Sequence, residues 1–131
     1  MANWKTPTDL KYQKSDEWVR IEGDTATIGI SDYAQDALND LAFLEYSASV
    51  GASLEKGEAF GSVESVKAQS ELLMPISGTI LEVNSALEKS PETVNGDPYG
   101  AGWMVKIKVK DASEAASLMD AAAYEAYCQT R

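Results

Sequence analysis

The sequence places one lysine, Lys67, midway between two segments that alternate apolar and polar residues as β-strands do. The first segment covers residues 58–66 and the second covers residues 68–74. Strands joined by so short a connection can pair only by folding back on each other, so we expect a tight antiparallel hairpin with Lys67 at its tip. The amine would then project into solvent on a rigid platform. Such a lysine is either a solvated turn residue or an amine presented for covalent modification.

Alternation elsewhere in the chain predicts that it is mainly β-structure. The further strands expected are residues 17–22, 25–30, 41–46, 79–83 and 103–110. Gly23-Asp24 joins the first two as a hairpin turn. Bulky groups on both faces of residues 41–46 predict a well-buried strand, and the lysines of residues 103–110 suit a strand at a sheet edge.

Short helices are predicted wherever capping residues precede a helical pattern. They are residues 33–38 after Ser31-Asp32, a single turn through Leu87 after Asn84-Ser85, residues 113–118 after Asp111, and residues 121–127 after Asp120. Residues 92–102 are rich in Asn, Asp, Pro and Gly, so residues 95–100 are expected to form an irregular but ordered loop. The fold class expected is an antiparallel β sandwich or barrel with short helices at its margins and C-terminus.

Composition narrows the function. The chain of 131 residues is expected to be one domain, residues 1–131. Its formal net charge of -10 argues against binding nucleic acid or an anionic membrane. It has no histidine and a single cysteine, Cys128, so no disulfide, metal site or catalytic residue is expected. We interpret Cys128 as a small, half-buried apolar side chain.

The N-terminal segment bears on localisation. Residues 1–10 lack the apolar run of a signal peptide and the arginine-rich pattern of a transit peptide. This favours a bacterial cytoplasm, although a mature organellar protein would have the same character.

The residues around the lysine carry a resemblance. Glu64-Ser65-Val66-Lys67-Ala68, followed by a Pro-x-Ser-Gly turn at residues 75–78, resembles the biotinyl/lipoyl-carrier superfamily with its hammerhead, barrel-sandwich hybrid fold. Biotin carriers usually flank the lysine with methionines, whereas Val66 and Ala68 flank it here. The pentapeptide resembles in particular the H protein family of the glycine cleavage system.

Several further motifs match that family in order, so the resemblance extends from about Leu10 to Cys128. They are Glu17-Trp18-Val19-Arg20, residues 26–35, Asp97-Pro98-Tyr99-Gly100, residues 102–108, and the final helix with Tyr124 and Tyr127.

The resemblance implies a non-catalytic carrier with lipoate amide-linked to Lys67. The attaching enzymes would recognise Glu64, Ser65, Val66 and Ala68 around it. The implied partners are a pyridoxal-phosphate glycine decarboxylase, a tetrahydrofolate-dependent aminomethyltransferase and dihydrolipoamide dehydrogenase, between which the arm would carry an aminomethyl group.

The family also folds its loaded arm into a surface cleft. The matching positions are Ser15, Glu17 and Glu71, and our hypothesis is that Glu17 and Glu71 hold the aminomethyl ammonium. The chain departs from the family pattern in that same region: Asp16 stands where histidine is common, Glu71 replaces aspartate, and Leu72-Leu73-Met74 is unusually apolar.

Other functions remain open at this point. The chain could be an H-like protein that acts as a lipoyl donor or scaffold in protein lipoylation. It could be the lipoyl domain of a 2-oxo acid dehydrogenase, although such modules usually lack the N-terminal hairpin-helix and C-terminal helices expected here. A stand-alone hydrolase is a more distant alternative.

Overall fold

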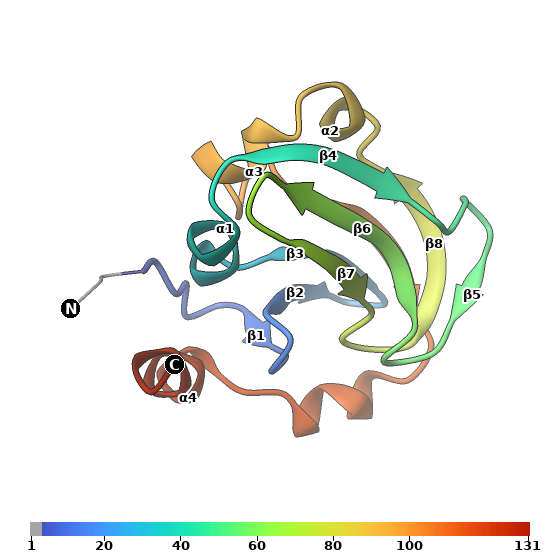
Figure 1. Cartoon of the computed structure of the whole chain (residues 1–131). Helices are drawn as coiled ribbons and strands as arrows, with labels where there is room; N and C mark the ends of the chain where they lie inside the picture. Colours follow the sequence, from blue (N-terminus) through green and yellow to red (C-terminus); the bar gives the residue numbers. More distant parts are fainter. Residues whose placement is uncertain (1–3) are drawn as a thin grey trace.

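The structure is a computed structural model, and it describes residues 4–131 (Figure 1). The residues before Trp4, where the N-terminal segment discussed above begins, lie outside the described part. In chain order the elements are β1 (Lys11–Tyr12), β2 (Glu17–Glu22), β3 (Thr25–Ile30), α1 (Asp32–Leu38), β4 (Leu41–Tyr46), β5 (Ser53–Leu54), β6 (Ala59–Ser65), β7 (Gln69–Leu73), β8 (Gly78–Val83), α2 (Ala86–Lys89), α3 (Glu92–Gly96), β9 (Val105–Val109), a 3-10 helix (Ala112–Ser117) and α4 (Ala121–Gln129).

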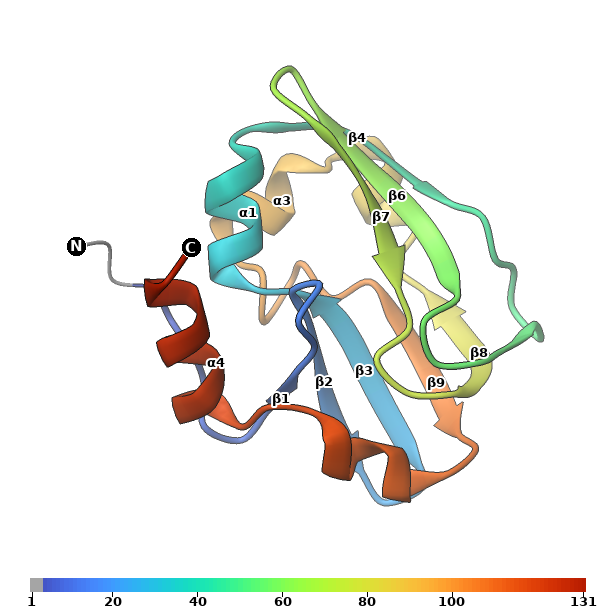
Figure 2. The same ribbon diagram turned by 60° about the horizontal axis from the view of Figure 1, so that its bottom comes forward.

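The strands form two antiparallel sheets that pack face to face without closing into a barrel (Figures 1 and 2). The larger, six-stranded sheet has the order β1-β2-β3-β9-β8-β5, and the smaller has the order β4-β6-β7. Apolar side chains from both sheets fill the space between them, among them Ile28, Phe60, Leu72 and Ile107, each fully buried. The expected fold class, an antiparallel sandwich with marginal helices, is confirmed.

Two expectations about strands are wrong. The strand expected at an edge, β9, lies inside the larger sheet between β3 and β8. Its lysines face outward, where Lys108 and Lys106 lie near Asp24 and Glu82 at 3.6 Å and 3.9 Å, so they mark a solvated face and not an edge. The strand expected to be buried on both faces, β4, is an edge strand, and its Phe43 is 66% exposed to solvent.

The helices form where the capping residues predicted them, with α3 in addition, although Ser85 precedes α2 without a side-chain capping hydrogen bond. The Ser31 side chain accepts a hydrogen bond from the Ala34 N–H and so caps α1 as expected. Residues 92–96 form α3, a helix that the sequence did not predict and that takes in the first two residues of the expected loop. Pro91 precedes α3 with φ of -61°, the torsion a helix start requires, so here the proline begins a helix. The segment after Asp111 forms a 3-10 helix capped by that aspartate.

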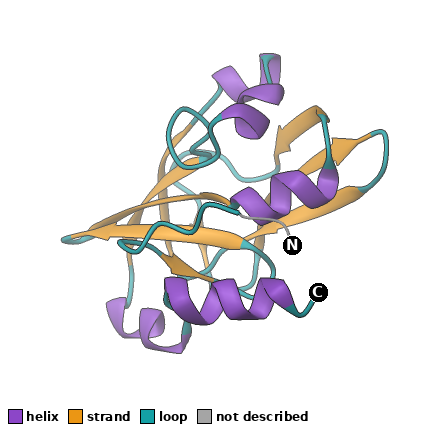
Figure 3. Ribbon diagram, turned by 90° about the vertical axis from the view of Figure 1, so that its left-hand side faces the viewer, coloured by secondary structure: helices purple, strands orange, loops and turns teal. Residues whose placement is uncertain are grey.

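A second cluster of buried side chains joins α4 to the outer end of the larger sheet. It consists of Leu10, Tyr12, Trp18, Ala121, Tyr124 and Cys128. The rings of Tyr12 and Tyr124 stack with their centroids 4.5 Å apart, and a backbone bridge pairs Tyr12 with Met119. Cys128 is an apolar member of this cluster as interpreted from the sequence, but it is fully buried and not half-buried. Figure 3 looks onto this side and shows α4 running to the C-terminus.

Among the described residues, no helix has the length and apolar character that a membrane crossing needs.

Candidate functional site

Lys67 is the middle one of the three residues that join β6 to β7, at the tip of a hairpin that stands clear of the rest of the molecule in Figure 2. The Ser65 hydroxyl accepts hydrogen bonds from the backbone N–H groups of Lys67 and Ala68, at 3.2 Å and 3.1 Å. The Ser65 N–H in turn donates to the Ala68 carbonyl at 2.8 Å. One buried side chain thus fixes the backbone of the tip, while the lysine itself is exposed.

The other residues implied in recognition by attaching enzymes surround this lysine. Val66 is 95% exposed, and Glu64 and Ala68 are also exposed. Ser65 alone points inward. The hairpin therefore presents three of these four side chains to solvent and uses the fourth to hold its shape.

A hollow of about 140 Å³ lies alongside the hairpin and brings the three cleft residues expected from the sequence to one place. Strand β7, helix α1 and the turn before β2 supply its walls. Its lining residues are Ser15, Asp16, Glu17, Ile30, Tyr33, Ala34, Ala37, Leu38, Val63, Ser70, Glu71, Leu72 and Arg131. The sheet and helix walls are mainly apolar, with Ser70, Glu71 and Tyr33 as their polar members, and the turn before β2 is polar.

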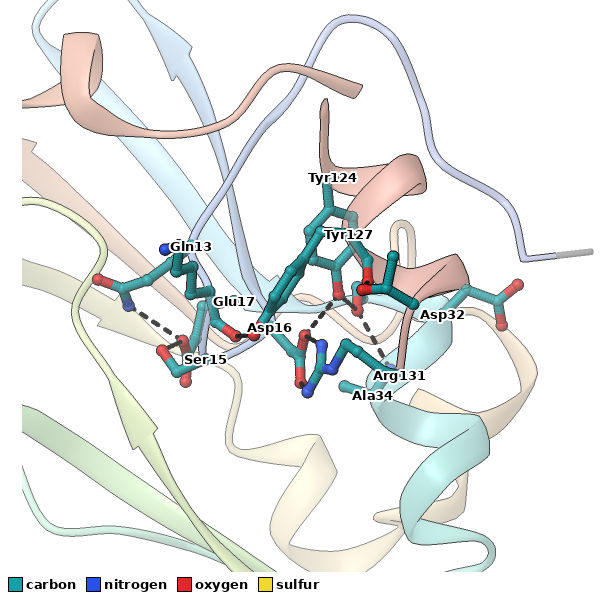
Figure 4. Close-up of polar contacts among 12 residues, drawn as sticks. Gln13, Ser15, Asp16, Glu17, Asp32, Ala34, Tyr124, Tyr127 and Arg131 are labelled. Atoms are coloured by element: carbon teal, nitrogen blue, oxygen red, sulfur yellow. Dashed lines mark hydrogen bonds and ion pairs between the residues drawn. The ribbon is translucent and has the colours of Figure 1, made fainter. Parts of the chain in front are cut away.

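Glu17 is the most unusual member, because it is a carboxyl group only 1% exposed. One oxygen accepts hydrogen bonds from the Ser15 hydroxyl and the Gln13 amide, and the other accepts from the Leu73 backbone N–H at 2.9 Å (Figure 4). All three donors are neutral. Burial raises the pKa of Glu17 above its ordinary value, against the lowering effect of these hydrogen bonds.

Glu17 also connects the two sheets. It begins β2 in the larger sheet, whereas Leu73 ends β7 in the smaller one. Glu17 is therefore not an ordinary solvated surface residue. Its carboxyl joins the two sheets across the cleft. A carboxylate at the first position of a buried strand could have predicted this, but that signal is weak on its own.

Glu71 has a different setting, since it is exposed and pairs with Ser62 on β6. Side chains alternate along a strand, so Ser70 and Leu72 face the sandwich interior while Glu71 faces away from it. Glu71 is thus at the rim of the hollow, and Glu17 is at its floor. Ser15 is exposed beside Glu17.

The apolar residues after Glu71 belong to the core. Leu72 and Met74 are fully buried between the sheets, and Leu73 is half-buried. Their apolar character therefore serves packing, and of the three only Leu72 lines the hollow.

Sequence reasoning missed Arg131, which forms the end wall of the hollow. Its guanidinium makes two contacts with the Asp16 carboxylate, which holds its pKa above the usual range. It also lies over the rings of Tyr33 and Tyr127, at 4.3 Å and 4.7 Å from the ring centres. No spacing pattern points to such a group, since Asp16 and Tyr33 come from two distant segments and only Tyr127 is close in sequence.

Metal-binding chemistry has no support in residues 4–131, where no group of three or more Cys, Asp or Glu side chains is arranged to hold an ion.

Comparison with known proteins gives one consistent result. The family model described as glycine cleavage H-protein matches residues 10–131. A curated protein of Bacteroides thetaiotaomicron named glycine cleavage system H protein is 53% identical over 120 residues, covering 92% of this chain and 94% of its own length. One of the same name from Laribacter hongkongensis is 54% identical over 120 residues, covering 91% of this chain and 94% of its own.

A mitochondrial relative and a solved structure agree. Glycine cleavage system H protein 2 of Arabidopsis thaliana is 49% identical over 121 residues, covering 92% of this chain and 77% of its own. The crystal structure of a glycine cleavage system H protein from Mycobacterium marinum superposes with a TM-score of 0.84 at 37% identity, covering 92% of this chain and 97% of that one.

Proposed function

This chain belongs to the glycine cleavage H-protein family, and we propose that it works as the lipoyl carrier of that system with Lys67 as the attachment point. The observation that carries the proposal is the rigid, exposed hairpin tip. A lysine there is open to the attaching enzyme and to each later partner, while Ser65 keeps the backbone in one conformation.

The cleft fits the proposed lipoyl group in both distance and chemistry. Ser70 and Glu71 lie three and four residues beyond Lys67, which along a strand is about 10 to 13 Å. A lysine side chain lengthened by a lipoyl chain covers that span. The apolar walls, including Leu38, Val63 and Leu72, suit a hydrocarbon chain. When bound, the group supplies a disulfide that can accept an aminomethyl group.

The floor of the cleft suits a cationic cargo. A buried carboxylate with only neutral donors is costly until a cation pairs with it. Glu17 is such a group, and a primary ammonium reaching it would supply the charge it lacks. Glu71, exposed at the rim, would attract the same cation on its way in. We therefore assign Glu17 as the inner partner, Glu71 as the outer partner, and Ser15 as a support to Glu17.

The proposed partners are the pyridoxal-phosphate decarboxylase, the tetrahydrofolate-dependent aminomethyltransferase, dihydrolipoamide dehydrogenase and the lipoate-attaching enzymes. The chain itself is proposed to be a non-catalytic component that works in the bacterial cytoplasm.

Intact-mass analysis of protein from lipoate-replete cells tests the attachment point. The wild-type chain is expected to carry one lipoyl-sized addition, and Lys67→Arg is expected to lose it. Lys56→Arg, a change at another exposed lysine, is the matched control and should keep the addition. A modified Lys67→Arg protein would reject the assignment.

Glycine–bicarbonate carbon exchange with the decarboxylase separates the carrier from a lipoyl donor. Fully lipoylated protein is expected to support exchange. If it is lipoylated on Lys67 but inactive in exchange, the donor or scaffold role is the better interpretation.

A further inference from the structure

The Arg131 guanidinium is a charged group beside the cleft to which the proposed carrier function gives no role. It is bound by Asp16 through both of its terminal nitrogens and enclosed by the rings of Tyr33 and Tyr127. Its side chain is 27% exposed and that of Asp16 is 14% exposed, so the pair is largely shielded from solvent. A planar guanidinium paired in this way holds its partner in one orientation, which a lysine ammonium does not do.

The backbone of Asp16 needs neighbouring groups to keep its conformation, because its φ is 82°. An aspartate tolerates this left-handed region better than most residues, but it still requires support. Backbone hydrogen bonds join the Asp16 N–H to the Gln13 carbonyl at 2.8 Å and the Ser31 N–H to the Asp16 carbonyl at 2.9 Å. The Tyr124 hydroxyl donates to the Asp16 carboxylate at 2.8 Å.

The turn that Asp16 closes carries the groups that hold Glu17. Gln13 and Ser15 lie in that turn, and both donate to the same Glu17 oxygen (Figure 4). The other Glu17 oxygen binds the Leu73 N–H at the base of the arm-bearing hairpin. A continuous set of contacts therefore runs from Arg131 through Asp16 and the turn to Glu17 and β7.

We propose that Arg131 is a positioning residue for the cargo cleft: by clamping Asp16 it fixes the turn at residues 13–16, and with it the placement of Glu17 against β7. The effect on the loaded arm rests on the proposed carrier function, whereas the contacts between Arg131 and Asp16 are present in the unmodified chain. Its role is to keep water from the loaded arm, because a loosened turn would open the cleft floor.

The reaction that the clamp would slow is hydrolysis of the cargo. Water supplies its oxygen to the methylene carbon, the carbon–sulfur and carbon–nitrogen bonds break, and the products are a free thiol, formaldehyde and ammonium. No oxidation or reduction takes place.

Amide hydrogen exchange in the unlipoylated protein tests the clamp directly. In Arg131→Ala, the Leu73 and Ser31 amides are expected to exchange about fivefold faster, the scale of losing one modest interaction. Gln129→Ala, an exposed change two residues earlier at the end of α4, is the matched control and should leave both rates unchanged. Arg131→Lys is expected to restore the rates only in part. Unchanged Leu73 exchange in Arg131→Ala would overturn the proposal.

Asp16→Asn gives a second, independent variant, because it keeps the turn's shape but removes the charge that binds Arg131. It is expected to reproduce the faster Leu73 exchange of Arg131→Ala. If Asp16→Asn leaves Leu73 exchange at the wild-type rate, the clamp does not reach β7 and the proposal is rejected.

The functional consequence is measured on loaded protein as a split between two rates. The rate at which the decarboxylase loads Arg131→Ala is measured separately, and the loaded variant should release ammonia and formaldehyde several-fold faster than the loaded wild type. Equal release rates would overturn the protective role. A chain that is never lipoylated would instead reject the carrier function, and the exchange results would still decide whether the clamp exists.

Discussion

Glu17 is a buried carboxyl group that links the turn before β2 to the end of β7. Taking a carboxylate out of water costs free energy that neutral hydrogen bonds repay only in part, so burial dominates its titration. The group is nevertheless retained at the start of a buried strand, where its oxygens are needed by donors on two sides. Its position is therefore explained by what it connects and by the charge it can receive.

The raised pKa of Glu17 predicts a pH dependence of stability. A carboxyl whose pKa is higher in the folded state than in the unfolded state stabilises the fold at pH values below its ordinary pKa of about 4.3. That contribution is lost as pH rises through the raised pKa. The unfolding free energy of the wild type, relative to Glu17→Gln, should therefore fall as pH rises from about 4. Denaturant titrations of both proteins at several pH values measure these unfolding free energies. An advantage of the wild type over Glu17→Gln that grows with pH would contradict the prediction.

Gly61 predicts a steric limit in the arm-bearing sheet. A Cβ atom added there would lie 2.5 Å from the Glu45 carbonyl oxygen of the paired strand, and a backbone atom cannot move aside without disturbing the pairing. Gly61→Ala should lower the unfolding free energy by about 1–3 kcal/mol. Gly96→Ala, where a Cβ meets nothing within 4 Å, is the control, and chemical denaturation compares the two. Equal stabilities would show that β4 and β6 separate easily.

Among the elements, the β6–β7 hairpin depends on the hydroxyl of Ser65. Ser65→Ala removes the acceptor for the Lys67 and Ala68 N–H groups and should cost about 1 kcal/mol. It should also speed amide exchange at both positions. Ser70→Ala, whose hydroxyl donates only to the neighbouring Glu71 carbonyl, serves as control. Wild-type exchange at the tip in Ser65→Ala would mean that backbone pairing alone holds it.

The elements were predictable to the extent that local signals determine them. Alternation with a Gly-Asp turn was enough for β2 and β3, and the Ser31 cap was enough for α1. The place of β9 within its sheet was not predictable in this way, because outward lysines look alike on an edge strand and on a solvated central one. For α3, the Asn, Asp, Pro and Gly content of residues 92–102 favoured a loop, although Pro91 starts a helix.

For the whole molecule, the packing of α4 depends on a buried tyrosine. The Tyr124 hydroxyl contacts both Ser31 and Asp16, and its ring is only 1% exposed. Burial raises its pKa well above the ordinary tyrosine value. Tyr124→Phe leaves two buried polar partners short of a hydrogen bond and should cost about 1–3 kcal/mol. Tyr127→Phe, with one long contact at 3.4 Å, is the control in thermal unfolding. Equal losses would contradict the assignment.

The candidate site was predictable where the sequence is contiguous and not where it is assembled from distant segments. The pattern around Lys67 lies within one hairpin, so it could be interpreted before the fold was known. Placing Glu17 at the floor and Glu71 at the rim required knowing which strands face each other. The contact between Arg131 and Asp16 joins the two ends of the chain, and no local pattern encodes it.

The pairing of Tyr12 with Met119 has a consequence for biosynthesis. Residues 119–131 leave the ribosome after every strand has been made, so the two sheets and the hairpin can form while Tyr12 on β1 still lacks its bridge to Met119. Contacts between segments so far apart in sequence are slow to close. The nascent chain thus passes through a stage in which Lys67 is already displayed but the end wall of the cleft is missing, and an attaching enzyme would meet it first in that unfinished form.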